Sequence, residues 1–405
     1  MRRPLLSGIV GLAVAAILVV GLLTVVGFWP AGTETRPVRG IDWQPVIHGP
    51  AVKFIEVPHL AVAGGRLYMV GYVGIRGSDG YSNEVWASAD GTAWERVSER
   101  AFEDGFHPYS MSDDGHGGLV VVGGSSSGPS GNPSPEAWHS TDGRIWTRAD
   151  AWNTETGPLI SVASRPGTVI AVGSLLASLG ARATAGHTTA DQVVVWISGD
   201  GKAWEHVILP DSTDYTEQEV VTAWRSGFVV VAVGPSGSST WTSVDGLAWE
   251  KAPTNLTNFS PSAICSLGDR VVTVGSKSGD FANGGGYYVA PVAWSSTDGR
   301  TWAESIAPTR LLDFSFDDIV DVGGGFVAIG SSLQGTDGAP GVKIPRPPAG
   351  VWTSSDGMTW RLLAENPLLK FRYAYDTHIA YVDGRVVVVT FGSSADDIYV
   401  GNLTR

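Results

Sequence analysis

One motif recurs six times along the 405-residue chain, and it constrains the fold more than any other feature. Each copy reads Trp, any residue, Ser, any residue, Asp-Gly, two further residues and Trp. The copies follow one another at intervals of 45 to 58 residues, and they contain 12 of the 16 Trp residues. A period in this range indicates β-propeller blades rather than a helical solenoid. The Asp residues of the six copies are Asp90, Asp142, Asp200, Asp245, Asp298 and Asp356.

A β-branched run that ends in Gly precedes each motif. The first run covers residues 67–71, and a seventh, residues 386–392, has no Trp motif after it. Continuous apolar runs of this length are typical of strands that are buried on both faces. Gly-containing turns before most of the runs predict hairpins. We therefore expect four antiparallel strands per unit: one before the turn, the run itself, the Trp-x-Ser segment and the segment around the second Trp.

The seventh unit, residues 373–402, lacks a fourth strand of its own. The segment around Asp42 and Trp43 resembles the fourth-strand pattern around Trp94. The sequence therefore predicts an all-β chain in which residues 40–405 form a seven-bladed β-propeller of four-stranded antiparallel blades, closed by the N-terminal strand. Closure of this kind covers two strand edges that would otherwise invite aggregation. The alternative is a two-domain all-β arrangement.

The Ser-x-Asp-Gly sequence suits a type I turn followed by a left-handed Gly. If residues 89–91 form this loop, Trp86 lies opposite Trp94 across the strand pair. The Asp would accept hydrogen bonds from its own turn, and the Gly would supply the positive φ. Ligand binding by the six Asp residues is the alternative, but recurrence in every unit favours a structural role.

The Ser-x-Asp-Gly-x-x-Trp copies resemble the Asp-box, or BNR, repeats of the sialidase-like β-propeller family. The motifs that carry the resemblance span residues 58–363. The usual box has one residue between Asp and Gly, whereas the two are adjacent here. The resemblance implies a propeller with the boxes on outer turns, away from the central ligand face. It also implies an Arg triad, a Tyr–Glu nucleophile pair and an Asp acid/base, and these catalytic motifs are not evident.

The nearest approach to such a catalytic set lies at the entry to the seventh unit. Arg372 would hold a substrate carboxylate, and Tyr373 or Tyr375 would act as the nucleophile beside Glu219. The alternative is a solvated loop whose aromatic residues cover the top of the ring, so the catalytic residues stay unassigned.

Two histidines occupy equivalent places in their units. His59 and His378 each lie seven residues before an Arg, Arg66 and Arg385. The first and last blades of a closed ring are neighbours, so we expect both side chains to line the central channel, with Asp318 as a further candidate. A metal site would need additional ligands. We therefore expect polar channel-lining residues here and no metal ion or cofactor.

The connections that lead into the first strand of each unit carry acidic and aromatic residues. Phe106, Phe314 and Phe316 are among them. Loops held by a rigid scaffold commonly carry binding. If these loops share one face, that face suits a sugar, a cation or a cationic peptide.

An uncharged segment precedes the repeats. Residues 5–29 are long enough, at about 37 Å as a helix, to cross a hydrocarbon core of about 30 Å. Arg2 and Arg3 precede the segment, and Trp29 lies where an interfacial anchor belongs. We expect residues 1–4 in the cytoplasm, a transmembrane signal anchor over 5–29, a linker over 30–39 and an extracytoplasmic propeller. A cleaved signal peptide is the alternative.

Charge and cysteine content narrow the function classes. The net charge of −13 and the pI near 5.0 argue against nucleic-acid binding. The single Cys excludes disulfides within the chain and Cys-based metal sites. The sequence predicts a membrane-anchored binding or scaffolding propeller for an unidentified glycan, peptide or protein partner on its loop face. A sialidase-like glycoside hydrolase is the alternative.

Overall fold

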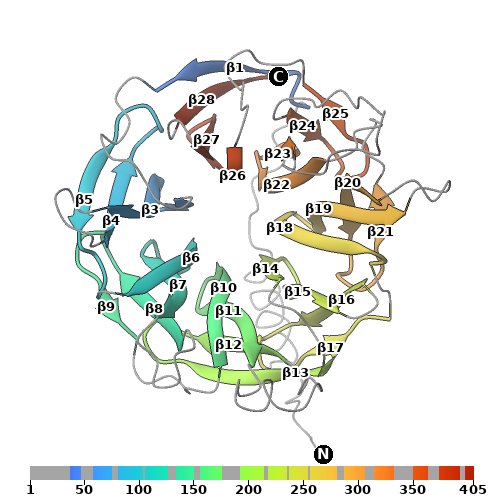
Figure 1. Ribbon diagram of the computed structural model, residues 1–405, viewed down its shortest axis with the longest axis horizontal. Coiled ribbons are helices and arrows are strands. Elements are labelled where there is room, and N and C mark those ends of the chain that lie inside the picture. Colours follow the sequence, from blue (N-terminus) through green and yellow to red (C-terminus); the bar gives the residue numbers. More distant parts are fainter. Residues whose placement is uncertain are drawn as a thin grey trace, which may run out of the picture. The chain divides into compact units, whose positions relative to one another are not determined.

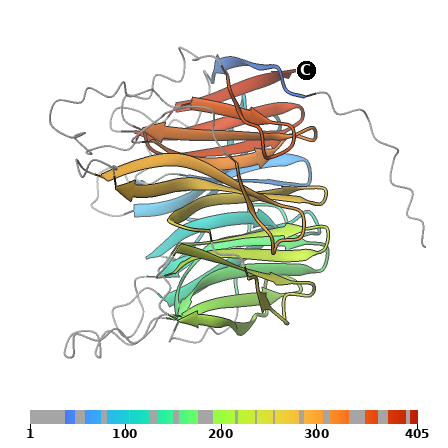
Figure 2. The ribbon, with the colours of Figure 1, turned by 90° about the vertical axis from the view of Figure 1, so that its right-hand side faces the viewer.

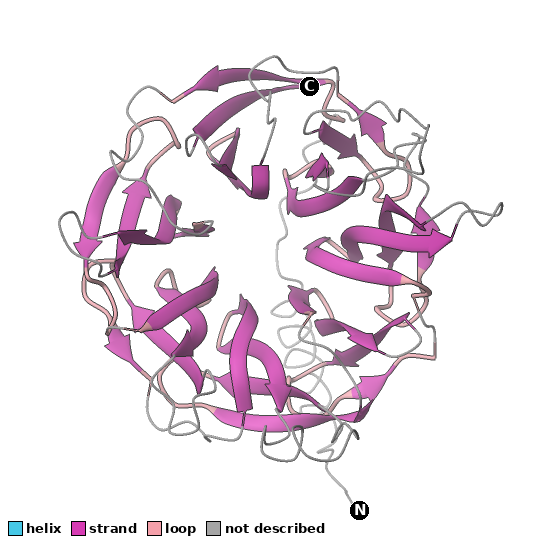
Figure 3. Cartoon of the chain, viewed as in Figure 1, coloured by secondary structure: helices cyan, strands magenta, loops and turns pink. Residues whose placement is uncertain are grey.

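Antiparallel hairpins build the whole of the described chain. In the computed structural model, 28 strands form seven four-stranded sheets among the described residues (Figures 1 and 3). The structure describes residues 37–46, 58–74, 81–103, 105–125, 134–149, 156–175, 192–213, 218–234, 237–253, 256–280, 287–305, 314–332, 350–363, 374–392 and 397–405.

The sheets follow one another in chain order, and each is one blade. The first three blades are β2 (His59–Ala63), β3 (Arg66–Gly74), β4 (Tyr81–Ser88) and β5 (Glu95–Glu99); β6 (Phe106–Asp113), β7 (Leu119–Ser125), β8 (Ser134–Ser140) and β9 (Thr147–Arg148); and β10 (Thr156–Arg165), β11 (Thr168–Leu175), β12 (Gln192–Ser198) and β13 (Glu205–Thr213). The next three are β14 (Glu219–Trp224), β15 (Gly227–Gly234), β16 (Gly237–Ser243) and β17 (Glu250–Lys251); β18 (Phe259–Leu267), β19 (Arg270–Asp280), β20 (Tyr287–Ser296) and β21 (Ala303–Ser305); and β22 (Phe314–Asp321), β23 (Phe326–Ser332), β24 (Gly350–Ser354) and β25 (Arg361–Leu362). The seventh is β26 (Ala374–Val382), β27 (Arg385–Gly392), β28 (Asp397–Thr404) and β1 (Gly40–Pro45).

The seven blades stand around a common axis. In Figure 1 the first strand of each blade lies nearest the centre and the fourth lies at the rim. Figure 2, turned by 90°, shows the strands running from one face of the ring towards the other. The predicted all-β, seven-bladed propeller of four-stranded antiparallel blades is therefore confirmed.

The seventh blade combines strands from distant parts of the chain. β1 pairs antiparallel with β28, from Gly40 opposite Thr404 to Pro45 opposite Tyr399. Trp43 is buried at the middle of this pairing, opposite Gly401. A Cβ on Gly401 would lie 2.2 Å from the Ile41 side chain and 2.9 Å from the Trp43 ring, so the close approach of the two strands requires Gly there.

The transmembrane segment expected over residues 5–29 lies outside the described residues. Within the part of the chain that the structure does describe, no helix is both long enough and apolar enough to cross a membrane.

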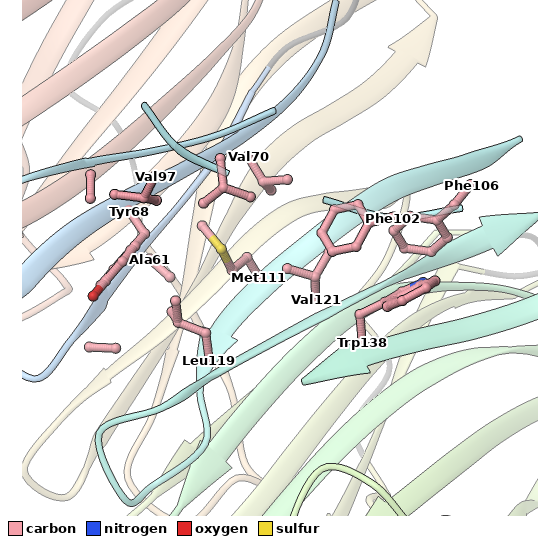
Figure 4. Packing of buried hydrophobic residues seen from close by; sticks show 13 residues of the cluster. Ala61, Tyr68, Val70, Val97, Phe102, Phe106, Met111, Leu119, Val121 and Trp138 are labelled. Carbon is pink, nitrogen blue, oxygen red and sulfur yellow. The ribbon is translucent and has the colours of Figure 1, made fainter. Parts of the chain in front are cut away.

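The second strand of each blade packs against both neighbouring blades. In β3, Leu67 and Met69 join a buried cluster with the seventh blade, whereas Tyr68 and Val70 join a cluster with the second. Figure 4 shows the latter cluster from close by. Successive side chains of a strand point to opposite faces, so a strand covered on both faces must be apolar throughout. The buried apolar residues of the described chain accordingly form seven clusters, one at each interface between blades.

The six Asp-Gly turns share one hydrogen bond, and five of them share two more. In all six, the Asp Oδ1 accepts the backbone amide two residues later at 2.8–2.9 Å. In five, the Ser hydroxyl accepts the Gly amide at 2.8–2.9 Å, and the second indole donates to the Gly carbonyl at 2.7–3.1 Å. The amide donors hold the pKa of Asp142 and of Asp200 below its ordinary value. Hydrogen bonding within the turn thus explains why Asp recurs at this position of the motif.

The expected pairing of the two Trp residues is wrong. Trp86 lies opposite Arg96, and the guanidinium carbon of Arg96 is 5.9 Å from the Trp86 ring centroid. Trp94 precedes the fourth strand and lies in the turn, where its Nε1 donates to the Gly91 carbonyl. The side-chain hydrogen bonds lengthen the turn beyond a three-residue loop, so the second Trp closes the turn instead of pairing across the strands.

Each turn also packs against the blade before it. A Cβ on Gly91 would lie 2.4 Å from the side chain of Val387 in the seventh blade. Asp90 beside it forms an ion pair with Arg385 of the same blade. The corresponding glycines of the other five turns face the side chains of the blade that precedes theirs. The repeated motif therefore serves contact between blades as well as the local turn.

The aromatic residues expected in the connecting loops lie elsewhere. Phe106, Phe314 and Phe316 are at most 1% exposed, and all three belong to inner strands, β6 and β22. They pack in the clusters between blades and contribute nothing to a loop face. Their hydrophobic area favours burial over exposure at a rim.

Replacing a turn glycine tests its packing role. Gly246 has a φ of +86°, and an added Cβ would lie 2.7 Å from Ile197 and 2.8 Å from Ile170. Gly167 has a φ of +78° with nothing within 4 Å of an added Cβ. We expect Gly246→Ala to lower the free energy of unfolding by about 1–3 kcal/mol more than Gly167→Ala does. Urea unfolding of the two variants measures the difference, and equal losses would contradict the packing role.

Candidate functional site

All seven inner strands line one cavity on the axis of the ring. Its volume is 420 Å³, and each blade contributes residues to its wall. Each apolar run forms the second strand of its blade, and its fourth residue pairs with one residue of the inner strand. These seven inner-strand residues occupy equivalent positions in the wall, and we call them the channel ring. The channel ring consists of His59, Ser110, Ser161, Val220, Ala263, Asp318 and His378.

The channel ring is chemically asymmetric. Five consecutive blades, from the sixth through the seventh and first to the third, contribute Asp318, His378, His59, Ser110 and Ser161, and we call these residues the polar arc. The fourth and fifth blades contribute Val and Ala at the same position. The next residue along every inner strand is aliphatic: Leu60, Met111, Val162, Val221, Ile264, Ile319 and Ile379. At the ring position, five blades therefore offer hydrogen-bonding groups, while the fourth and fifth blades offer apolar side chains.

Side chains of the polar arc bind the backbone of the following blade. The Ser110 and Ser161 hydroxyls each accept the amide of an inner-strand residue in the next blade, Val162 and Val221, at 3.2 Å. An inner strand has a neighbour on one side alone, so half of its amides face away from its own sheet. A hydroxyl from the preceding blade satisfies one of them, which fixes the position of the polar arc.

Asp318 joins the sixth blade to the seventh within the polar arc. Its Oδ1 accepts the Ile319 amide at 2.7 Å, and its Oδ2 accepts the Ile379 amide of the seventh blade at 2.9 Å. The same Oδ2 lies 3.3 Å from Nδ1 of His378. An ionised carboxylate accepts and does not donate, so this contact places the proton of that imidazole on Nδ1. The Asp318 side chain is 17% exposed and that of His378 is 24% exposed.

His59 is held in its neutral form. Its ring centroid lies 4.9 Å from that of His378, and its Nε2 lies 3.1 Å from the Pro108 carbonyl oxygen. A carbonyl accepts, so Nε2 carries the proton and Nδ1 is the acceptor. Burial lowers the pKa of His59 to about 3, helped by repulsion from His378 and opposed by the Pro108 carbonyl.

Glu219 adds a second carboxylate to the wall. It immediately precedes the ring residue Val220, is 2% exposed and accepts a hydrogen bond from the Ser174 hydroxyl of the third blade at 2.6 Å. Among the described residues that line the cavity, none is Arg or Lys.

The candidate catalytic set is not assembled within the described residues. Arg372 and Tyr373 lie outside them, and Tyr375 is placed on β26 without a described side chain. Glu219 lines the cavity, as do His59, His378 and Asp318.

No metal-binding cluster was found in the described part of the chain, where no three His, Cys, Asp or Glu side chains are arranged to hold an ion. Nε2 of His59 contacts the Pro108 carbonyl, and Nδ1 of His378 contacts Asp318.

Sequence reasoning missed two members of the polar arc. Ser161 lies seven residues before the first residue of β11, which is the spacing that identified His59 and His378. The same spacing fails for Ser110, because the turn that follows β6 is longer than the turn after β2. Ser is common in strands and turns, so neither residue is conspicuous without the hairpin register.

Comparison with known proteins shows similarity in structure alone. No protein-family description matches the chain, and no curated protein matches it. Virginiamycin B lyase from Staphylococcus aureus is similar in structure, with a TM-score of 0.54 and 8% identity over 90% of this chain and 99% of that one.

Two glycoside hydrolases are also structurally similar. An ancestral GH74 enzyme has a TM-score of 0.50 and 14% identity over 87% of this chain and 45% of that one. A GH32 β-fructofuranosidase from Bombyx mori has a TM-score of 0.39 and 10% identity over 92% of each chain. At these identities the similarity to the lyase and the GH74 enzyme shows a shared β-propeller fold.

The neutral state of His59 has a consequence for acid stability. Between pH 6.5 and about 3, the unfolded chain binds a proton at this imidazole that the folded chain does not. Stability therefore falls as the pH decreases through this window. We expect His59→Gln, which keeps a donor near the Pro108 carbonyl, to lose less stability than the wild type between pH 7 and pH 4.

Urea unfolding midpoints of both proteins across this range measure the difference. The turn carboxylates titrate in both proteins, so they cancel in the comparison. Parallel curves would show that the imidazole takes up a proton without cost in the folded state.

Proposed function

We propose that the protein is a binding propeller and that the central cavity is its ligand site. The polar arc carries this proposal, because it places a carboxylate, two imidazoles and two hydroxyls on one side of a 420 Å³ cavity. Ligand sites commonly have volumes of about 300–1,000 Å³ and combine apolar walls with a few convergent polar groups. The ligand class is a glycan, a peptide or an exposed segment of a protein partner.

Asp318 and His378 support binding at the polar arc in particular. Both side chains are partly exposed. Asp318 is nevertheless fixed by two backbone amides from two blades. Polar groups that are held in place before a ligand arrives lose little entropy on binding. The scaffold therefore favours recognition through this arc.

A sialidase-like glycoside hydrolase is the alternative, and the Asp-box family assignment belongs with it. This activity needs arginines that hold a carboxylate, together with a Tyr–Glu pair. The described lining supplies Glu219 and no arginine. The alternative therefore depends on Arg372 and on Tyr373 or Tyr375, and the binding function has more support from the described residues.

The proposed location is the outer face of a membrane, with residues 5–29 as an uncleaved anchor. Support comes from the 25 uncharged residues and from Arg2 and Arg3 before them. We also propose that β1 is the strand that closes the ring, because its six residues pair with β28. In this arrangement the anchor and the closing strand are separated by a short linker.

A side chain that fills the cavity tests the binding function. Ser262 lines the cavity and is exposed, so Ser262→Trp adds bulk to the space without displacing a buried group. Ser355→Trp, at an exposed position in an outer turn, is the matched control. We expect glycan and peptide arrays probed with the full-length wild type in detergent to give ligands that Ser262→Trp binds at least about tenfold more weakly.

The control variant should bind these ligands as the wild type does. Ligands held equally well by both variants would move the binding site away from the cavity, and blank arrays would count against the binding function.

Extraction of membranes tests the anchor. We expect the full-length protein to stay in the membrane pellet after washing at alkaline pH, because a spanning apolar helix resists this treatment. We also expect the recovered protein to retain residues 1–30 in N-terminal sequencing. A soluble protein whose first residue follows residue 29 would establish a cleaved signal instead.

A further inference from the structure

We propose that the cavity recognises an alkylammonium group, either as a free amine or as the side chain of a lysine in a peptide. This inference rests on the proposed function, because it names the chemistry of the ligand that the cavity would hold. It follows from the balance of charge in the wall and from the division between the polar arc and the aliphatic residues.

The described wall carries two carboxylates, and His378, which lies 3.3 Å from Asp318, is the basic group that faces them. Asp318 and Glu219 are the carboxylates, and the described lining contains no Arg or Lys. His59 adds no positive charge, since burial keeps it neutral. A concave site lined by one sign of charge attracts the opposite sign, and its low dielectric strengthens that attraction. The cavity therefore favours a cation over a neutral or anionic group.

Asp318 is the carboxylate that the ligand would reach. Its side chain is 17% exposed, whereas Glu219 is 2% exposed and accepts the Ser174 hydroxyl. The amides of Ile319 and Ile379 fix the Asp318 carboxylate. An ammonium group brings three donors and no acceptor, which suits the acceptor oxygens of a carboxylate.

The aliphatic part of the wall suits the stem of such a ligand. Leu60, Met111 and Ile264 each lie one residue after a member of the channel ring. Val220 and Ala263 are the two apolar members of the channel ring itself. Lysine and linear amines combine an apolar chain with a charged end, and they bury the chain along apolar surface. An alkylammonium group therefore matches both the carboxylate and the aliphatic positions of the wall.

Calorimetric titration of the full-length protein in detergent tests this inference with four probes. Cadaverine represents a free amine, and the blocked tripeptide Gly-Lys-Gly represents a lysine side chain. Maltose and glucuronate represent neutral and anionic ligands. We expect at least one of the two ammonium probes to bind the wild type, and the stronger of the two identifies the source of the group. Maltose and glucuronate should give no heat of binding.

Two kinds of variant locate the binding. Asp318→Asn keeps the shape of the side chain and removes its charge, and we expect it to weaken ammonium binding about thirtyfold. Asp269→Asn, at an exposed acid that pairs with Arg225, should bind as the wild type does. Ala263→Lys adds a fixed cation to the cavity wall without removing any hydrogen bond, and it should weaken binding at least about tenfold more than Ala263→Gln.

If Asp318→Asn fails to fold, the comparison of Ala263→Lys with Ala263→Gln still tests the inference. Binding of maltose or glucuronate that Ser262→Trp abolishes, with no binding of either ammonium probe, would overturn the ammonium ligand and leave the binding function intact. Ammonium binding that Asp318→Asn and Ala263→Lys leave unchanged would also overturn it. No binding by any probe would overturn the ammonium ligand, while the array experiment decides the binding function separately.

Discussion

Packing between neighbouring blades is the interaction on which the rest of the structure depends. A single four-stranded sheet has two apolar faces, and the alternating side chains of β3 show that each face is buried by a different neighbour. No blade can therefore bury its own apolar residues alone. The Asp-Gly turn reinforces the same contact, since Gly91 lies against Val387 of the adjacent blade. The ring is the arrangement in which every face of every blade is covered.

The sequence predicted the features of the fold that follow directly from packing between blades. Seven apolar runs and six Trp motifs predicted seven blades because a strand covered on both sides has no polar positions. The pairing of Trp86 and Trp94 was not predictable from spacing, because hydrogen bonds within the turn set the register of the fourth strand. Phe106 was misassigned because β6 begins at this residue, directly after the turn residue Gly105, whose φ is +88°.

The candidate site was partly predictable. His59 and His378 stood out because a titratable residue recurred at one spacing from the hairpin turn. Their neighbour Ser110 did not, because the turn after its strand is longer and places Ser110 at a different spacing from the next strand. The neutral state of His59 was not predictable from the sequence, because the burial that lowers its pKa depends on contacts between blades.

The interface between the sixth and seventh blades has no Asp-Gly turn from the seventh blade. Arg361 instead donates to the carbonyls of Val38 and Arg39, and Arg405 donates to the Val322 carbonyl. The other blades arise from consecutive hairpins, which form with small losses of chain entropy. Joining β1 to β28 closes a loop that spans every other described strand, and the entropic cost of closing a loop rises with its length. This strand pair therefore carries the largest loop-closure cost among the described pairs.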